Sequence, residues 1–161
     1  MIYLKSDTDM IKMRRGCRLV GELLEALSEK IVPGVSTLEL DSFAEDFIRS
    51  RGGVPAFKGY RADGLPPFPG SICASLNSGI VHGIPSATTI LKDGDLIGID
   101  VGVLLDGFYG DAARSYAVGT VDAAAERLMS VTREALRRGI EAAVVGNRIG
   151  DISHAIGSYV Q

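Results

Sequence analysis

Two aspartates, Asp100 and Asp111, have the spacing of residues that could bind metal ions together. Asp106-Gly107 lies between them and is a strong signal for a two-residue hairpin turn, so counting back from it places Gly102 opposite Asp111. Because side chains alternate along a strand, the two carboxylates should share one face of the hairpin. Diagonal neighbours lie about 7–8 Å apart at the backbone, and carboxylates that converge from there could hold two divalent cations.

The alternative for these aspartates is that both face solvent, as aspartates on strands usually do. Asp100, however, lies in the apolar run Leu96–Val103, which predicts a buried strand. A buried carboxylate is costly without a cation or several hydrogen-bond donors. The residues alone leave both interpretations open.

The other reactive side chains are few. His82 follows an apolar stretch and precedes a glycine and a proline, so we expect it on a loop, where functional residues concentrate, although a structural histidine is the more common case. His154 falls on the polar side of the last predicted helix and is interpreted as a surface residue. Cys17 and Cys73 occur in unrelated contexts, which indicates free thiols in a reducing compartment. Cys73 has no basic neighbour in the sequence that would make it a nucleophile.

Apolar periodicity predicts two helices before these residues. The first should begin at Ser6, whose hydroxyl can form a capping box with Asp9, and should end at Pro33-Gly34. Its buried stripe should comprise Ile11, Cys17, Val20, Leu24, Leu27 and Ile31. The second should run from Ser36 to Gly52 and bury Leu40, Phe43, Ala44, Phe47 and Ile48.

The segments that follow are predicted as strands and then helices again. Residues 54–70 are a turn-rich loop with three aromatics, residues 71–76 a short strand, and residues 95–105 and 108–118 a pair of strands. Helices should resume over about 122–144 and from about 149 to the end.

This order of elements indicates an incomplete internal repeat. A shift of 112 residues places Gly34 on Gly146 and Leu24 on Leu136, so a long helix, a glycine break and a second helix occur twice. We expect a single incomplete domain over residues 1–161, with a first repeat at about 1–119 and the start of a second at about 120–161. A complete protein with two full repeats would have about 250 residues. Without the second sheet, the apolar face at Ile97, Ile99, Val101 and Val103 should lack part of its cover and a hairpin edge should stay open.

Composition excludes several classes of protein. Apolar residues make up 46% of the 161 residues and the net charge is −3, which is typical of a globular protein and gives no cationic footprint for binding nucleic acid. No apolar run approaches the roughly 20 residues of a membrane span. The first 16 residues lack the pattern of a signal peptide, so a cytoplasmic location is expected.

The motifs together resemble a known family. The tetrapeptide HGIP at 82–85, followed by LKDGDLIGIDVGVLLDGFYGD at 91–111, is similar to type I methionine aminopeptidase, an α+β protein of the pita-bread fold. The resemblance implies a hydrolase that removes the initiator methionine from nascent proteins and peptides. It implies two divalent metal ions (Co, Mn, Fe or Zn), no membrane or independent nucleic-acid partner, a contact with the ribosome, and a monomeric complete enzyme.

The resemblance also implies roles for individual residues. Asp100 is similar to a terminal metal ligand, Asp111 to the ligand that bridges both ions, and His82 to the catalytic histidine that contacts the substrate. Tyr60, Phe68 and Cys73 are similar to residues that line the methionine pocket.

The chain departs from the family pattern at several points. Phe68 replaces the usual tyrosine, and the loop from Arg61 to Pro67 is longer than usual. The remaining ligands of the family, one histidine and two glutamates, would lie beyond residue 161, so we expect this chain alone to be inactive and prone to self-association. Two alternatives stay open: a proline-specific peptidase of the same fold, and a non-catalytic pita-bread protein that binds nascent chains or other partners.

Overall fold

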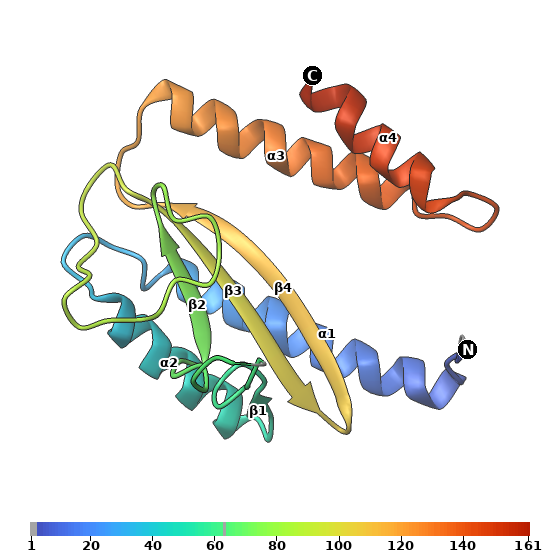
Figure 1. Cartoon of the computed structure of the whole chain (residues 1–161), viewed down its shortest axis with the longest axis horizontal. Coiled ribbons are helices and arrows are strands. Elements are labelled where there is room, and N and C mark those ends of the chain that lie inside the picture. Colours follow the sequence, from blue (N-terminus) through green and yellow to red (C-terminus); the bar gives the residue numbers. More distant parts are fainter. Residues whose placement is uncertain (1–2, 63) are drawn as a thin grey trace. The chain divides into compact units, whose positions relative to one another are not determined.

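The computed structural model describes residues 3–62 and 64–161. Its elements are the helices α1 (Asp7–Ser28) and α2 (Thr37–Ser50), the strands β1 (Val54–Pro55), β2 (Ile72–Leu76), β3 (Leu96–Leu105) and β4 (Phe108–Ala117), and the helices α3 (Ala123–Ala142) and α4 (Ile149–Val160) (Figure 1). They form two compact units, one that ends at Thr120 and one that begins at Val121. The first unit holds the sheet and the second holds α3 and α4.

The sheet of the first unit is antiparallel and centred on β3, which pairs with β4 along its whole length and with β2 and β1 (Figure 1). Asp106 and Gly107 form the β3–β4 turn with φ values of 53° and 83°, the positive pair that a type I′ turn requires. Leu105 therefore pairs with Phe108, and Gly102 with Asp111. The register expected from the Asp-Gly signal is confirmed.

The first two helices cover one face of this sheet. α1 packs on β3 and β4, and α2 on β1 and β2. The side chains of Ile97, Ile99, Val101 and Val103 are all 0% exposed in this layer. The expectation that this apolar face lacks part of its cover is therefore wrong, because α1 and α2 fill it without help from a second sheet.

The helix starts follow the predicted capping chemistry. Ser6 and Asp9 form a capping box at α1, and Ser36 and Glu39 form another at α2. The buried stripe of α1 begins only at Gly16, so the predicted inward positions Ile11 and Cys17 are exposed instead.

Two contacts fix α1 against β4. Gly110 and Gly16 bring the two backbones together so closely that a Cβ atom on Gly110 would lie 2.7 Å from the carbonyl carbon of Gly16. The buried Tyr116 hydroxyl donates a hydrogen bond to the Leu24 carbonyl oxygen at 2.6 Å. Together these contacts fix the height of the helix above the strand that carries Asp111.

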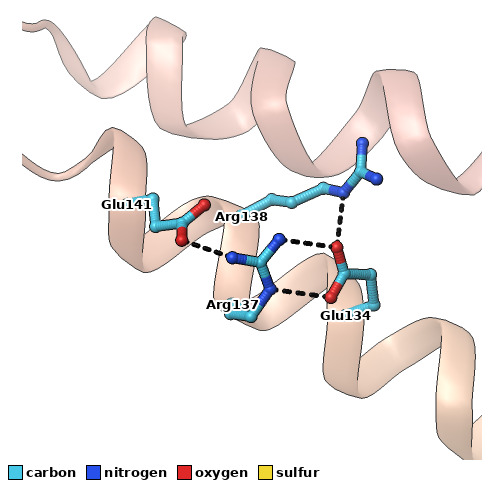
Figure 2. A network of polar contacts seen from close by, with 4 residues as sticks. All are labelled: Glu134, Arg137, Arg138 and Glu141. Atoms are coloured by element: carbon cyan, nitrogen blue, oxygen red, sulfur yellow. Dashed lines mark hydrogen bonds and ion pairs between the residues drawn. The ribbon is translucent and has the colours of Figure 1, made fainter.

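The second unit is a helical pair. Asp122 caps α3 by accepting a hydrogen bond from the Ala125 amide at 2.7 Å, and Gly139 allows Ile156 of α4 to approach α3. On the surface of α3, two acidic and two basic side chains form a network of ion pairs (Figure 2). They are Glu134, Arg137, Arg138 and Glu141. That two helix pairs of this chain form a structural repeat stays a prediction.

Two further predictions concern the loop and the membrane. Residues 54–70 were expected to contain only loop, yet Val54 and Pro55 form the short strand β1 against Leu104 and Val103. A strand of two residues is below the length at which side-chain alternation can be recognised. Among the described residues, no helix has the length and apolar character needed to cross a membrane.

Candidate active site

The two aspartates lie on the sheet face that points away from α1 and α2. Residues 97, 99, 101 and 103 of β3 point into the helical layer, so by alternation Asp100 and Gly102 point the other way. Asp111 is the direct partner of Gly102, which places both carboxylates on that face. Asp100 is half-buried and Asp111 is exposed.

Electrostatics indicate that the two carboxylates interact. Burial raises the pKa of Asp100 above its usual value, and the charge of Asp111 raises it further. Among the described residues, no lysine, arginine or histidine forms an ion pair with either carboxylate. Two neighbouring carboxylates without a basic partner suit a divalent cation.

Cys73 lies beside this pair. It belongs to β2 and is the direct cross-strand partner of Asp100. Burial raises the pKa of the Cys73 thiol to about 11, with further contributions from Asp100, Asp111 and Asp41. The thiol is therefore neutral at physiological pH and is no nucleophile, which leaves it suited to contact an apolar ligand.

His82 is brought to the same face by the residue that follows it. The Gly83 amide donates a hydrogen bond to Ser75 Oγ at 3.1 Å, and the Gly83 carbonyl accepts one from the Ala74 amide at 2.8 Å. A Cβ atom on Gly83 would lie 2.1 Å from the Ala74 carbonyl oxygen, so only glycine permits this approach to β2. The His82 side chain is exposed, and its charge favours the ionised form of Asp100, which lowers the pKa of that carboxyl.

Tyr60 and Phe68 are paired in spite of the long loop between them. The Phe68 amide donates to the Tyr60 carbonyl at 2.9 Å, and the Gly59 amide donates to the Phe68 carbonyl at 2.8 Å. The two ends of the loop are therefore joined through their backbones, at Gly59 and Tyr60 on one side and Phe68 on the other. Of the predicted loop from Arg61 to Pro67, Asp63 lies outside the described residues.

Phe57 is a site residue that the sequence analysis missed. A Cβ atom on Gly102 would lie 2.5 Å from Phe57 Cε1, so the ring covers the glycine that faces Asp111. The signal was present, because a glycine inside a strand often marks the close approach of another group. Phe57 also connects the site to the paired aromatics, since its carbonyl accepts a hydrogen bond from the Tyr60 amide at 2.9 Å.

Asp41 of α2 was also missed. Its side chain is 5% exposed and its Oδ1 accepts hydrogen bonds from the backbone amides of Ser71 and Ile72, at 2.6 and 3.0 Å. Burial raises the pKa of Asp41, and the two amide bonds oppose that effect. Asp41 therefore holds the start of β2, two residues before Cys73. Its position one residue after Leu40, on the buried side of α2, was the available signal.

The donor set fits divalent metal ions and is small. Asp100 and Asp111 provide carboxylate oxygens, which suit Mn, Fe, Co and Zn. Within residues 3–62 and 64–161 there is no group of three or more His, Cys, Asp or Glu side chains that could hold a metal ion. The described residues thus bring two carboxylates together on one face of the sheet.

Known proteins share both the sequence and the structure of this chain. It is 46% identical over 161 residues to the methionine aminopeptidase of Clostridium acetobutylicum, and the match covers 100% of this chain and 62% of that protein. The crystal structure of methionine aminopeptidase from Rickettsia prowazekii superimposes with a TM-score of 0.92 at 42% identity, over 99% of this chain and 62% of that one. The chain therefore spans about 62% of the length of these relatives.

More distant structures show the fold. Prolidase from Pyrococcus furiosus superimposes with a TM-score of 0.82 at 19% identity, over 98% of this chain and 43% of that one. The expected α+β pita-bread fold is thereby confirmed. The model of the metallopeptidase family M24 matches residues 11–161. Because this family match spans most of the chain, the chain belongs to metallopeptidase family M24.

Proposed function

We propose that the protein to which this chain belongs removes the N-terminal methionine from peptides and newly made proteins. The observation that carries the proposal is the placement of Asp100 and Asp111 on one sheet face, with His82 and Cys73 beside them. Relatives that are named methionine aminopeptidase support the choice of substrate.

In this proposal Asp100 and Asp111 hold two divalent ions, which can be Mn, Fe, Co or Zn. When bound, such ions supply Lewis-acid polarisation of the scissile carbonyl and lower the pKa of water. His82, exposed on its loop, donates a hydrogen bond to the substrate carbonyl as negative charge develops there. Tyr60, Phe68 and Cys73 form the pocket for the methionine side chain, where a neutral thiol and aromatic edges suit a thioether.

The remaining ligands are proposed to come from the part of the relatives' length that this chain does not span. Two carboxylates alone give a weak site, so we expect residues 1–161 on their own to bind divalent ions weakly and to release no methionine. The open edge of β4 is a surface through which the isolated chain can self-associate. For the complete enzyme we propose a cytoplasmic monomer that acts near the ribosome.

A chimera tests the proposal directly. Residues 1–161 are continued by the remaining C-terminal part of the Clostridium acetobutylicum methionine aminopeptidase, and methionine release from a Met-Gly peptide is measured with added Mn or Co. We expect the chimera to be active. We expect Asp100→Asn and Asp111→Asn each to lower kcat/KM at least about 100-fold, because each removes a direct ligand.

The controls separate this function from its alternatives. Asp95→Asn, at a carboxylate that bonds Asn77 and the Lys92 amide away from the site, should keep the activity within about threefold. Cleavage of X-Pro peptides in preference to Met-Gly peptides would replace the proposal with a proline-specific peptidase. A folded chimera that binds Mn but cleaves neither peptide would indicate a binding protein without catalysis.

A further inference from the structure

A second concave site lies on the helical side of the first unit. It is a cleft of about 320 Å³ between α1, the C-terminal end of α2 and the end of β3, lined by Arg15, Arg18, Leu19, Glu22, Arg51 and Leu105. Its α1 residues lie on a single stripe of the helix, at i, i+3, i+4 and i+7. The Asp100 and Asp111 carboxylates point away from this helical layer, so the cleft is separate from the candidate active site.

Three arginines line this cleft, and two of them form no ion pair with a described carboxylate. Arg15 forms an ion pair with Asp106 at 2.7 Å. Within the described part of the chain, neither Arg18 nor Arg51 has a carboxylate at ion-pair distance. Among the described residues that line the cleft, two arginines without an ion pair stand against one carboxylate, Glu22, so the lining carries a net positive charge.

Arg51 is also held in place. Its guanidinium stacks on the Phe47 ring at 3.4 Å from the ring centre, and its Nη1 donates to the Phe47 carbonyl at 3.3 Å. A guanidinium fixed by stacking loses little conformational entropy when it binds an anion. Arg18 lies on the α1 wall of the same cleft.

We propose that this cleft binds a small phosphate monoester with an apolar or aromatic body. A planar guanidinium donates two parallel hydrogen bonds to phosphate oxygens, which favours phosphate over a single-point anion. The apolar body would lie against Leu105, which is half-buried, and against the small exposed part of Leu19, which otherwise belongs to the core. The volume lies at the lower end of the range for small-molecule sites. The Glu22 carboxylate on the same wall repels an anion. Removing its charge should therefore strengthen phosphate binding, whereas removing the arginine charges should weaken it.

The test is a titration of the folded chain with phenyl phosphate and, separately, with inorganic phosphate at 0.15 M salt. NMR chemical shifts and calorimetry monitor the binding. Arg18→Gln combined with Arg51→Gln should weaken phenyl phosphate binding at least about tenfold. Glu22→Gln should tighten it about two- to fivefold, because a nearby like charge is removed. Inorganic phosphate should bind the native chain more weakly than phenyl phosphate.

Matched controls change the same charge elsewhere. Arg49→Gln removes an arginine that is paired with Glu45 outside the cleft. Glu29→Gln removes a carboxylate seven residues after Glu22, which is about 10 Å along a helix and beyond the screening length. Both should change the affinity less than twofold. Equal losses for the Arg49 variant and the double variant, or equal gains for Glu29→Gln and Glu22→Gln, would overturn the proposal. Equal affinity for phenyl phosphate and inorganic phosphate would also overturn the proposal. The absence of any NMR shift at 20 mM ligand would do the same, because a site with a Kd of about 1 mM would be saturated at that concentration.

Discussion

Substituting Gly110 by alanine should separate α1 from β4. A Cβ atom there would lie 2.7, 2.8 and 2.9 Å from the carbonyl carbon and oxygen of Gly16 and the amide nitrogen of Cys17. These are backbone atoms, which cannot rotate away, and normal contacts are about 3.5–4.0 Å. The helix must therefore move outward, and we expect a loss of about 2–3 kcal/mol in the free energy of unfolding, at the upper end for overpacking.

Gly16→Ala is the matched control, because it adds the same methyl group from the other side of the contact. The new Cβ would meet only the Gly110 amide nitrogen at 3.6 Å and the Phe108 carbonyl oxygen at 3.9 Å, which are ordinary distances. Since alanine is favoured over glycine inside a helix by about 1 kcal/mol, this variant should be as stable as the native chain or more so.

Urea unfolding followed by far-UV circular dichroism measures both variants in the same buffer. The expected order of stability is Gly16→Ala, then the native chain, then Gly110→Ala. If Gly110→Ala were as stable as Gly16→Ala, the helix would be free to shift over the strand, and the assigned close contact would not limit their spacing.

Three further predictions concern buried polar groups. Burial raises the pKa of Tyr116 from 10.0 to about 12, so the unfolded chain ionises first and stability should fall as the pH rises from 10 to 12. Tyr116→Phe should reduce this pH dependence in urea titrations, and the part that remains should come from Cys73, whose pKa is also raised, to about 11. The substitution should cost about 1 kcal/mol at pH 7, because the Leu24 carbonyl loses its donor. Asp111→Asn should lower the pKa of Asp100 in a carboxyl NMR titration, because the charge of Asp111 is one of the two causes that raise it, and an unchanged pKa would mean that the two carboxylates do not interact. Asp41→Ala should lower the free energy of unfolding by about 2–4 kcal/mol, measured by thermal or urea unfolding, because two backbone amides at the start of β2 lose a charged acceptor. An unchanged free energy of unfolding would mean that water replaces the carboxylate.

The sequence predicted best what is determined locally. Asp106-Gly107 permits the positive φ values of a type I′ turn, and a two-residue turn leaves one register for the strands beside it. The relation between Asp100 and Asp111 follows from that turn alone. The capping boxes at Ser6 and Ser36 are equally local, since donor and acceptor lie three residues apart.

Features that depend on distant partners were predicted less well. Nothing near Ile99 in the sequence indicates that α1 and α2 suffice to cover its face of the sheet. Phe57 and Gly102 meet across 45 residues, and Asp41 reaches Ser71 across 30. Alternation and helical periodicity identify which side of an element is buried, but not which element lies against it.

The hydrogen bonds that join Gly59 and Tyr60 to Phe68 make the intervening loop a place where this chain can change length at little cost. Because its two ends are already tied together, adding residues at the tip changes only the entropy of closing the loop, and doubling the length costs about 0.6 kcal/mol. The aromatics at the base are not displaced by such a change. A change of length in this loop should therefore leave the joined residues at its base in place, and an experimenter can insert a fluorescent or affinity tag there on the same grounds.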